Sequence, residues 1–115
     1  MSTPEKKVKD KVKAILRAED VYYFMPATYG YGSSGVPDIV ACLDGTFVGI
    51  ECKANGNKPT QLQITNLMRI AETGGIAFVV DENTLDLFES HLKSLRTGGG
   101  GGIFWNLQEE HNDVK

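Results

Sequence analysis

The sequence is poor in cysteine and histidine and has no long apolar run. Its 115 residues include two cysteines, Cys42 and Cys52, and two histidines, with no CxxC or Cys/His spacing. Neither a zinc site nor a disulfide framework is therefore suggested. No apolar stretch reaches the length of a membrane span, and the N-terminal "MSTPEKKVKDKVK" lacks the apolar core of a signal peptide. We expect a soluble protein of the reducing cytoplasm with no membrane partner.

Two common enzyme signatures are also missing. The glycine-rich "GYGSSG" lacks the Lys-Ser/Thr ending of a phosphate-binding P-loop. His91 falls in a charged segment and His111 lies near the C-terminus, so a Ser-His-Asp triad has no obvious place. An enzyme of either of these two classes is therefore poorly supported.

The composition suits one small domain. With 41% hydrophobic residues the chain can form a core, although a domain of this size has little stability in reserve and dimerisation would add buried surface. A net charge of −3 argues against general nucleic-acid binding, yet half of the twelve Lys and Arg residues fall between residues 6 and 17. This basic segment is either a solvated helix surface or a face that guides DNA.

Periodicity and turn signals predict an α/β fold with a mixed central sheet flanked by helices, in the order αβββαβα. Helices are expected at residues 3–20, 58–75 and 82–96. Strands are expected at residues 21–27, in a hairpin at 35–53, and at 75–81. We assign residues 1–107 to one domain, with a flexible glycine run from Gly98 to Gly102, a further short strand at 103–107 and a polar tail at 108–115.

The hairpin "GVPDIVACLDGTFVGIECK" brings two carboxylates together. If Asp44 and Gly45 form its two-residue turn, the ladder sets Asp38 opposite Glu51 on one face of the sheet. Directly opposed residues have Cβ atoms about 5 Å apart. Lys53, two residues beyond Glu51, points to the same face. The register therefore predicts an Asp-Glu pair with an adjacent lysine.

Such a pair is costly by itself. Two unit charges about 4 Å apart repel by about 4 kcal/mol at an effective dielectric of 20, whereas a good cross-strand pair contributes only about 0.2–1 kcal/mol. Either one carboxyl keeps its proton or a cation lies between the two. Oxygen ligands without a cysteine or histidine cluster suit a hard ion such as Mg²⁺.

Two polar residues begin apolar helix stripes and could face the same site. Glu5 precedes Val8 by three positions on the first expected helix, and Gln63 precedes Leu67 by four on the second. Both could instead be exposed residues of a first helical turn, where Glu5 would complement the helix dipole.

These residues resemble the core of the PD-(D/E)XK nucleases. More closely, "GVPDIVA", "GIECK" and "PTQLQ…GG" resemble the virus-type replication-repair nuclease (VRR-NUC) family, of which the chain would be a small stand-alone member. The resemblance extends from about Glu5 to Asp81. It implies a restriction-endonuclease-like core.

The resemblance also implies the site. Asp38, Glu51 and the Cys52 backbone carbonyl would bind Mg²⁺ or Mn²⁺, and Glu5 would contact the metal directly or through water. Lys53 would be the catalytic lysine, and Gln63 would match the family's glutamine, which lies beside the site. We count Glu5, Asp38, Glu51, Lys53 and Gln63 as candidate catalytic residues.

By the same resemblance the reaction is hydrolysis of DNA phosphodiester bonds, leaving 5′-phosphate and 3′-hydroxyl ends. Stand-alone relatives resemble homodimers that act on branched DNA, including four-way junctions, so we expect an activity like that of a Holliday junction resolvase. A phage or other mobile-element origin is implied as well. Candidate DNA contacts, from the basic helix and the loop "TYGYGSSG", are Lys6, Lys9, Lys13, Tyr29, Tyr31, Ser33 and Ser34.

Three other interpretations remain open from the sequence. The enzyme could be a repair nuclease directed to flaps or ends. The fold could instead serve a DNA-binding subunit without catalysis. In a purely structural protein, Lys53 would simply neutralise Glu51 on an exposed sheet face, which leaves Asp38 unexplained.

Overall fold

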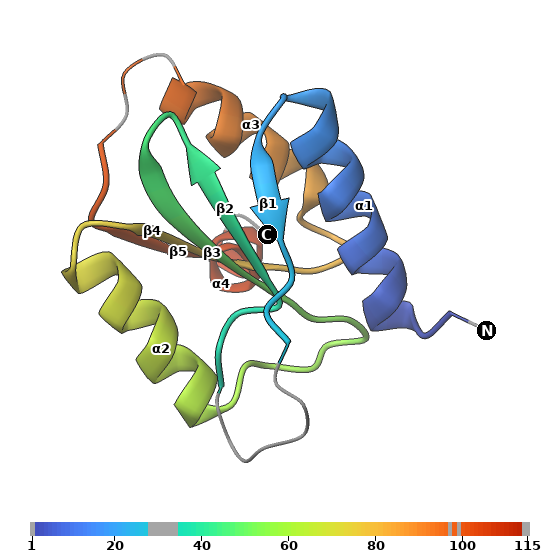
Figure 1. Ribbon diagram of the computed structural model, residues 1–115. Coiled ribbons are helices and arrows are strands. Elements are labelled where there is room, and N and C mark those ends of the chain that lie inside the picture. Colours follow the sequence, from blue (N-terminus) through green and yellow to red (C-terminus); the bar gives the residue numbers. More distant parts are fainter. Residues whose placement is uncertain (1, 28–34, 97, 99, 114–115) are drawn as a thin grey trace.

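The computed structural model describes residues 2–27, 35–96, 98 and 100–113; for residues 112 and 113 it describes the backbone alone. The elements follow one another as α1 (Pro4–Ala18), β1 (Tyr22–Phe24), β2 (Ile39–Leu43), β3 (Thr46–Cys52), α2 (Gln61–Glu72), β4 (Ile76–Val80), α3 (Leu85–Arg96), β5 (Ile103–Asn106) and α4 (Leu107–Asp113) (Figure 1). In this part of the chain, no helix combines the length and the apolar character that crossing a membrane requires.

A five-stranded sheet in the order β1-β2-β3-β4-β5 forms the centre of the fold. The β1–β2 and β2–β3 pairs are antiparallel, and the β3–β4 and β4–β5 pairs are parallel. The predicted α/β class with a mixed sheet flanked by helices is confirmed. The structure also confirms the last short strand and adds a fourth helix.

The main core lies between the sheet and the pair α1 and α3, which cover one face of it (Figure 1). Helix α2 packs on the opposite face, over β3, β4 and β5. Its smaller core is made by Leu67, Ala77 and Val79, with Ile70 and Phe104 against them. All five residues of β4 are apolar and buried, as expected for a strand that is covered on both faces.

The C-terminal segment differs from its expected form. Residues 108–113, expected in a polar tail, belong to helix α4. The helix is anchored by Leu107, which is fully buried, and by Gln108, whose amide donates hydrogen bonds to the Asn57 carbonyl (3.0 Å) and the Asp81 carboxylate (3.2 Å). A buried amide with protein partners carries little sequence signal, because glutamine is mostly an exposed residue.

Part of the glycine run packs against a turn. The Gly102 N–H donates to the Gly75 carbonyl at 2.7 Å. A Cβ on Gly101 would lie 1.8 Å from the Gly74 carbonyl oxygen. These glycines allow two backbone segments to touch, a role that the expectation of a flexible loop did not include.

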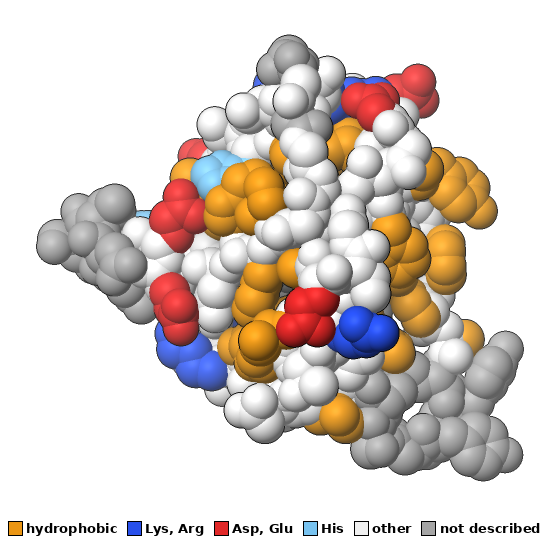
Figure 2. Space-filling view, turned by 90° about the vertical axis from the view of Figure 1, so that its left-hand side faces the viewer, with side chains coloured by type: hydrophobic (Ala, Val, Ile, Leu, Met, Phe, Trp, Pro, Cys, Tyr) orange, Lys and Arg blue, Asp and Glu red, His pale blue; other side chains and the backbone are white. Residues whose placement is uncertain are grey.

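The face of the sheet that carries α2 is only partly covered. Over β1 and β2 it exposes apolar side chains, with Tyr22 73% and Phe24 50% exposed, and Phe47 of β3 lies beside them. Figure 2 shows hydrophobic side chains gathered along its right-hand edge, which corresponds to the front of Figure 1. Cys42 is exposed on this face for the same reason.

Gly49 lets two segments approach β3 beneath α2. A Cβ at this position would lie 2.6 Å from Ile70 Cδ1 and 2.9 Å from Pro37 Cγ. Both distances are shorter than van der Waals contact, so a side chain would force apart α2 and the segment that precedes β2.

We expect Gly49→Ala to lower the free energy of unfolding by about 1 to 3 kcal/mol, since overpacking a tight core costs that much. Gly100→Ala is the control, because a Cβ there would have no heavy atom within 4 Å. Urea denaturation monitored by circular dichroism measures both variants. Equal stability of Gly49→Ala and the parent would show that Ile70 and Pro37 yield without cost.

Candidate functional site

The predicted hairpin register is confirmed. Leu43 pairs with Thr46, and the ladder continues to Ile39 opposite Ile50. Asp38 immediately precedes β2, so the next step along the ladder sets it beside Glu51. Glu51 contacts Gln63 of α2, whereas Asp38 contacts Lys9 of α1, so the pair lies at the end of β3 within reach of both helices.

Asp38 is held by the backbone of β3. Its Oδ2 accepts a hydrogen bond from the Cys52 N–H at 2.8 Å. Because the N–H and C=O of one residue in a strand point to the same side, the Cys52 carbonyl is also directed toward Asp38. The Cys52 side chain is buried in the main core, where burial raises the pKa of its thiol well above the usual value. Cys52 can thus offer the site its backbone but not a thiolate.

Glu51 is the buried acid of the site, only 1% exposed. Its Oε2 accepts a hydrogen bond from Gln63 Nε2 at 3.0 Å and lies 3.6 Å from Lys53 Nζ. Its Oε1 is buried and has no hydrogen-bond partner. Burial, followed by the nearby Asp38 carboxylate, raises the pKa of Glu51 to about 8.

Gln63 joins the start of α2 to Glu51. Its Oε1 accepts from the Thr60 N–H at 2.9 Å, and its own N–H donates to Thr60 Oγ1 at 3.2 Å, a capping box. Its Nε2 remains free to donate to Glu51. Gln63 therefore belongs to the first helical turn, but it is half-buried and reaches the site, so it is not an exposed residue.

Lys53 is the lysine nearest to Glu51, and its side chain is only 12% exposed. Its backbone N–H extends the parallel ladder by donating to the Val80 carbonyl at 2.9 Å. The strand therefore fixes the base of the side chain, and the ammonium lies against Glu51. A lysine buried to this extent is unusual without a charged partner.

A second lysine links Glu5 to Asp38. Lys9 Nζ lies 3.4 Å from Asp38 Oδ1 and 3.8 Å from Glu5 Oε2. Burial by itself would lower the pKa of Lys9, but the nearby acids, Asp38 first and then Glu5, together outweigh this effect, and the pKa lies above its usual value. The sequence suggested Lys9 as a DNA contact and missed its place beside Asp38. The signal was its position one turn after Glu5, on the same side of α1.

The other candidate DNA contacts do not join this cluster. Lys6 and Lys13 pair with Asp10 on the outer surface of α1, at 3.1 and 3.2 Å. Hydrogen bonds from Lys6 and then Lys13 lower the pKa of Asp10 below its usual value. The remaining candidates, Tyr29, Tyr31, Ser33 and Ser34, lie outside the residues that the structure describes.

The donor set fits a hard divalent cation. The unpartnered Glu51 Oε1, the Asp38 carboxylate and the Cys52 carbonyl direction supply oxygen ligands only. Mg²⁺ is typically bound by one or two carboxylates, with water and substrate phosphate completing its octahedron. No cluster of three or more His, Cys, Asp and Glu side chains suited to a metal occurs among the described residues. Glu5 thus stands apart from the Asp38–Glu51 pair.

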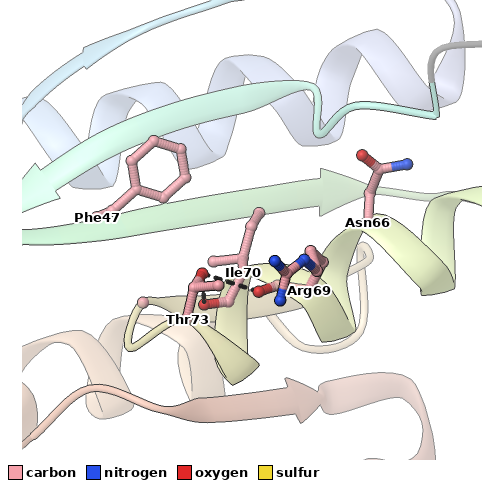
Figure 3. A pocket seen from close by; sticks show the side chains of 6 residues that line it. Phe47, Asn66, Arg69, Ile70 and Thr73 are labelled. Atoms are coloured by element: carbon pink, nitrogen blue, oxygen red, sulfur yellow. Dashed lines mark hydrogen bonds between the residues drawn. The ribbon is translucent and has the colours of Figure 1, made fainter.

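A separate pocket between Phe47 and α2 has few reactive side chains in its lining. Figure 3 shows Phe47, Asn66, Arg69, Ile70 and Thr73 around it. The volume of the pocket is about 290 Å³. The Thr73 hydroxyl donates to two carbonyls of its own helix, so it is already engaged. Arg69 is the one ionisable residue in its lining. This pocket therefore offers no carboxylate, imidazole or thiol for acid–base or metal chemistry.

The chain is similar to a phage protein. It is 40% identical over 55 residues to "Putative nuclease p44" of Acyrthosiphon pisum secondary endosymbiont phage 1. The match covers 47% of this chain and 59% of the phage protein, so the chain spans somewhat more than half of that relative's length. No protein-family model matches the chain.

In buffer without divalent ions, we expect stability to fall as the pH rises from about 5 to about 8. The native state holds the Glu51 proton up to about pH 8, whereas the ordinary pKa is 4.5. Across this interval the folded protein binds more protons than the unfolded chain, so raising the pH favours unfolding. Urea denaturation at a series of pH values in EDTA measures the slope. Glu51→Gln should flatten it, and an unchanged slope in that variant would assign the effect to another group.

Proposed function

We propose that the protein is a metal-dependent nuclease that hydrolyses phosphodiester bonds in DNA. The observation that carries the proposal is the buried Glu51 beside Asp38, with one carboxylate oxygen left without a partner. Burying two acids together weakens the fold unless a cation compensates them. The name of the similar phage protein supports the same activity class. The resemblance to the VRR-NUC nucleases supports it independently.

Each residue of the site has a distinct part in this reaction. Mg²⁺ or Mn²⁺, when bound, would hold a phosphate oxygen and lower the pKa of a bound water. Asp38 and Glu51 would hold the ion, and Gln63 would keep Glu51 oriented through its hydrogen bond at 3.0 Å. Lys53 would stabilise the negative charge that develops on the phosphate.

We propose branched DNA as the substrate and a homodimer as the active form. A twofold dimer would offer two sites to a twofold substrate such as a four-way junction. The exposed apolar face over β1 and β2, with Tyr22, Phe24 and Phe47, is a surface that a second copy could cover. Flap or end cleavage is the alternative if a single copy acts alone. A DNA-binding subunit without catalysis would gain nothing from carboxylates held next to phosphate.

We expect Lys53→Ala to abolish Mg²⁺-dependent cleavage while DNA binding survives, because the variant keeps both carboxylates but loses the ammonium beside Glu51. Loss of one such electrostatic group should slow cleavage by about 100-fold or more. Lys58→Ala is the matched control, since Lys58 is an exposed lysine of the loop after β3. Gel assays of cleavage and fluorescence anisotropy of binding separate the two steps. If Lys53→Ala cuts as fast as the parent, the role of Lys53 is wrong.

The substrate is tested with labelled duplex, flap, splayed and four-way DNAs, each with Mg²⁺ or with EDTA. We expect symmetric cuts in the four-way junction and a dimer by light scattering. Tyr22→Ser combined with Phe24→Ser should shift the protein toward monomer, because both side chains are exposed on the open sheet face. Cuts confined to flaps or ends by a monomer would favour the repair nuclease. Cleavage of none of the DNAs would favour the binding subunit.

A further inference from the structure

We infer that Lys9 is a built-in counter-cation of the metal site, which neutralises Asp38 in the absence of metal and which a divalent ion must displace. The inference rests on the proposed function, because it concerns the same carboxylates. It assigns to Lys9 a role in setting metal affinity, apart from the role of Lys53 in the reaction.

The position of Lys9 is the first argument. Its ammonium bridges two acids, 3.4 Å from Asp38 Oδ1 and 3.8 Å from Glu5 Oε2. Because Asp38 lies outside α1, this contact places the Lys9 ammonium at the site. Lys6, one turn earlier on the same helix, pairs with Asp10 instead. The basic helix therefore divides its lysines between the surface and the site.

The distribution of partners over the carboxylate oxygens is the second argument. Asp38 Oδ2 is occupied by the Cys52 N–H, so Oδ1 is the oxygen left for a metal ion, and Lys9 lies against it. On Glu51, Oε2 is taken by Gln63 and Lys53, whereas Oε1 is buried and unpartnered. Two oxygens are thus available to a metal ion. Asp38 Oδ1 is in contact with Lys9, and Glu51 Oε1 has no hydrogen-bond partner.

The repulsion between two cations requires the metal ion to replace the Lys9 ammonium at Asp38. An ammonium in contact with Asp38 Oδ1 and a divalent ion bound to the same oxygen would repel each other strongly at this separation. The long lysine stem allows the ammonium to leave Asp38 while keeping its contact with Glu5, one helical turn away. Glu5 would therefore act on the metal site through Lys9, as the acceptor that receives the displaced ammonium. This places Glu5 near the site without making it a ligand.

The test is metal binding by the whole protein without DNA, measured by isothermal titration with MnCl₂. Lys9→Met keeps the apolar stem and removes the charge, so we expect Mn²⁺ to bind about tenfold or more tightly, since a single neighbouring charge shifts the proton affinity of a carboxylate by about that factor. Lys9→Arg keeps the charge and should bind Mn²⁺ as the parent does. Lys13→Met is the matched control on the same helix, because Lys13 pairs with Asp10.

A second measurement separates this role from a merely structural one. In EDTA, Lys9→Met should melt at a lower temperature than the parent, because the two acids lose a counter-ion, and saturating Mn²⁺ should remove the difference. If Lys9→Met does not fold in EDTA, the titration is made with Lys9→Gln, for which the same increase is expected. Unchanged or weaker Mn²⁺ binding in the charge-removing variants would overturn the inference and leave the proposed nuclease intact. Absence of Mn²⁺ binding by the parent and by every variant would overturn the metal site itself.

Discussion

The electrostatic cost of placing Asp38 beside Glu51 is the constraint on which the rest of the site depends. The hairpin makes this arrangement unavoidable, since its turn fixes the ladder that sets the two residues opposite each other. Each carboxylate has its own stabilising partners. Asp38 contacts the Cys52 N–H and Lys9. Glu51 contacts Gln63 and Lys53. Burial of Glu51 remains only partly compensated, which is why its proton is retained to unusually high pH.

Local rules in the sequence accounted for the fold and for the centre of the site. A two-residue turn at Asp44 and Gly45 determines the register of β2 and β3 completely, so the Asp38–Glu51 pair followed from counting. The turn and periodicity signals for α2 and β4 were equally local, and both elements formed within the expected ranges, 58–75 and 75–81. The position of Gln63 beside Glu51 followed from the start of α2 together with the resemblance to known nucleases.

Features that depend on long-range packing could not be predicted in the same way. Lys9 has two possible directions on α1, toward solvent or toward Asp38, and only the placement of α1 against the sheet decides between them. Helix α4 depends on Gln108 finding the Asn57 carbonyl and Asp81 more than 25 residues away, which no local pattern encodes. The exposure of Cys42 follows from the position of α2 over β3, β4 and β5, a property of the assembled layers.

The double engagement of Gln63 has a consequence for how this chain could vary. One amide group both closes the first turn of α2 and holds Glu51, so the distance from Thr60 to the end of β3 is a fixed dimension of the site. Insertions or deletions between Cys52 and Thr60 are therefore tolerable only if they bulge outward and return Thr60 to the same point. The segment that joins β3 to α2 is therefore a spacer of fixed length. A change in its length would disturb the Gln63–Glu51 hydrogen bond before it disturbed the packing of the core.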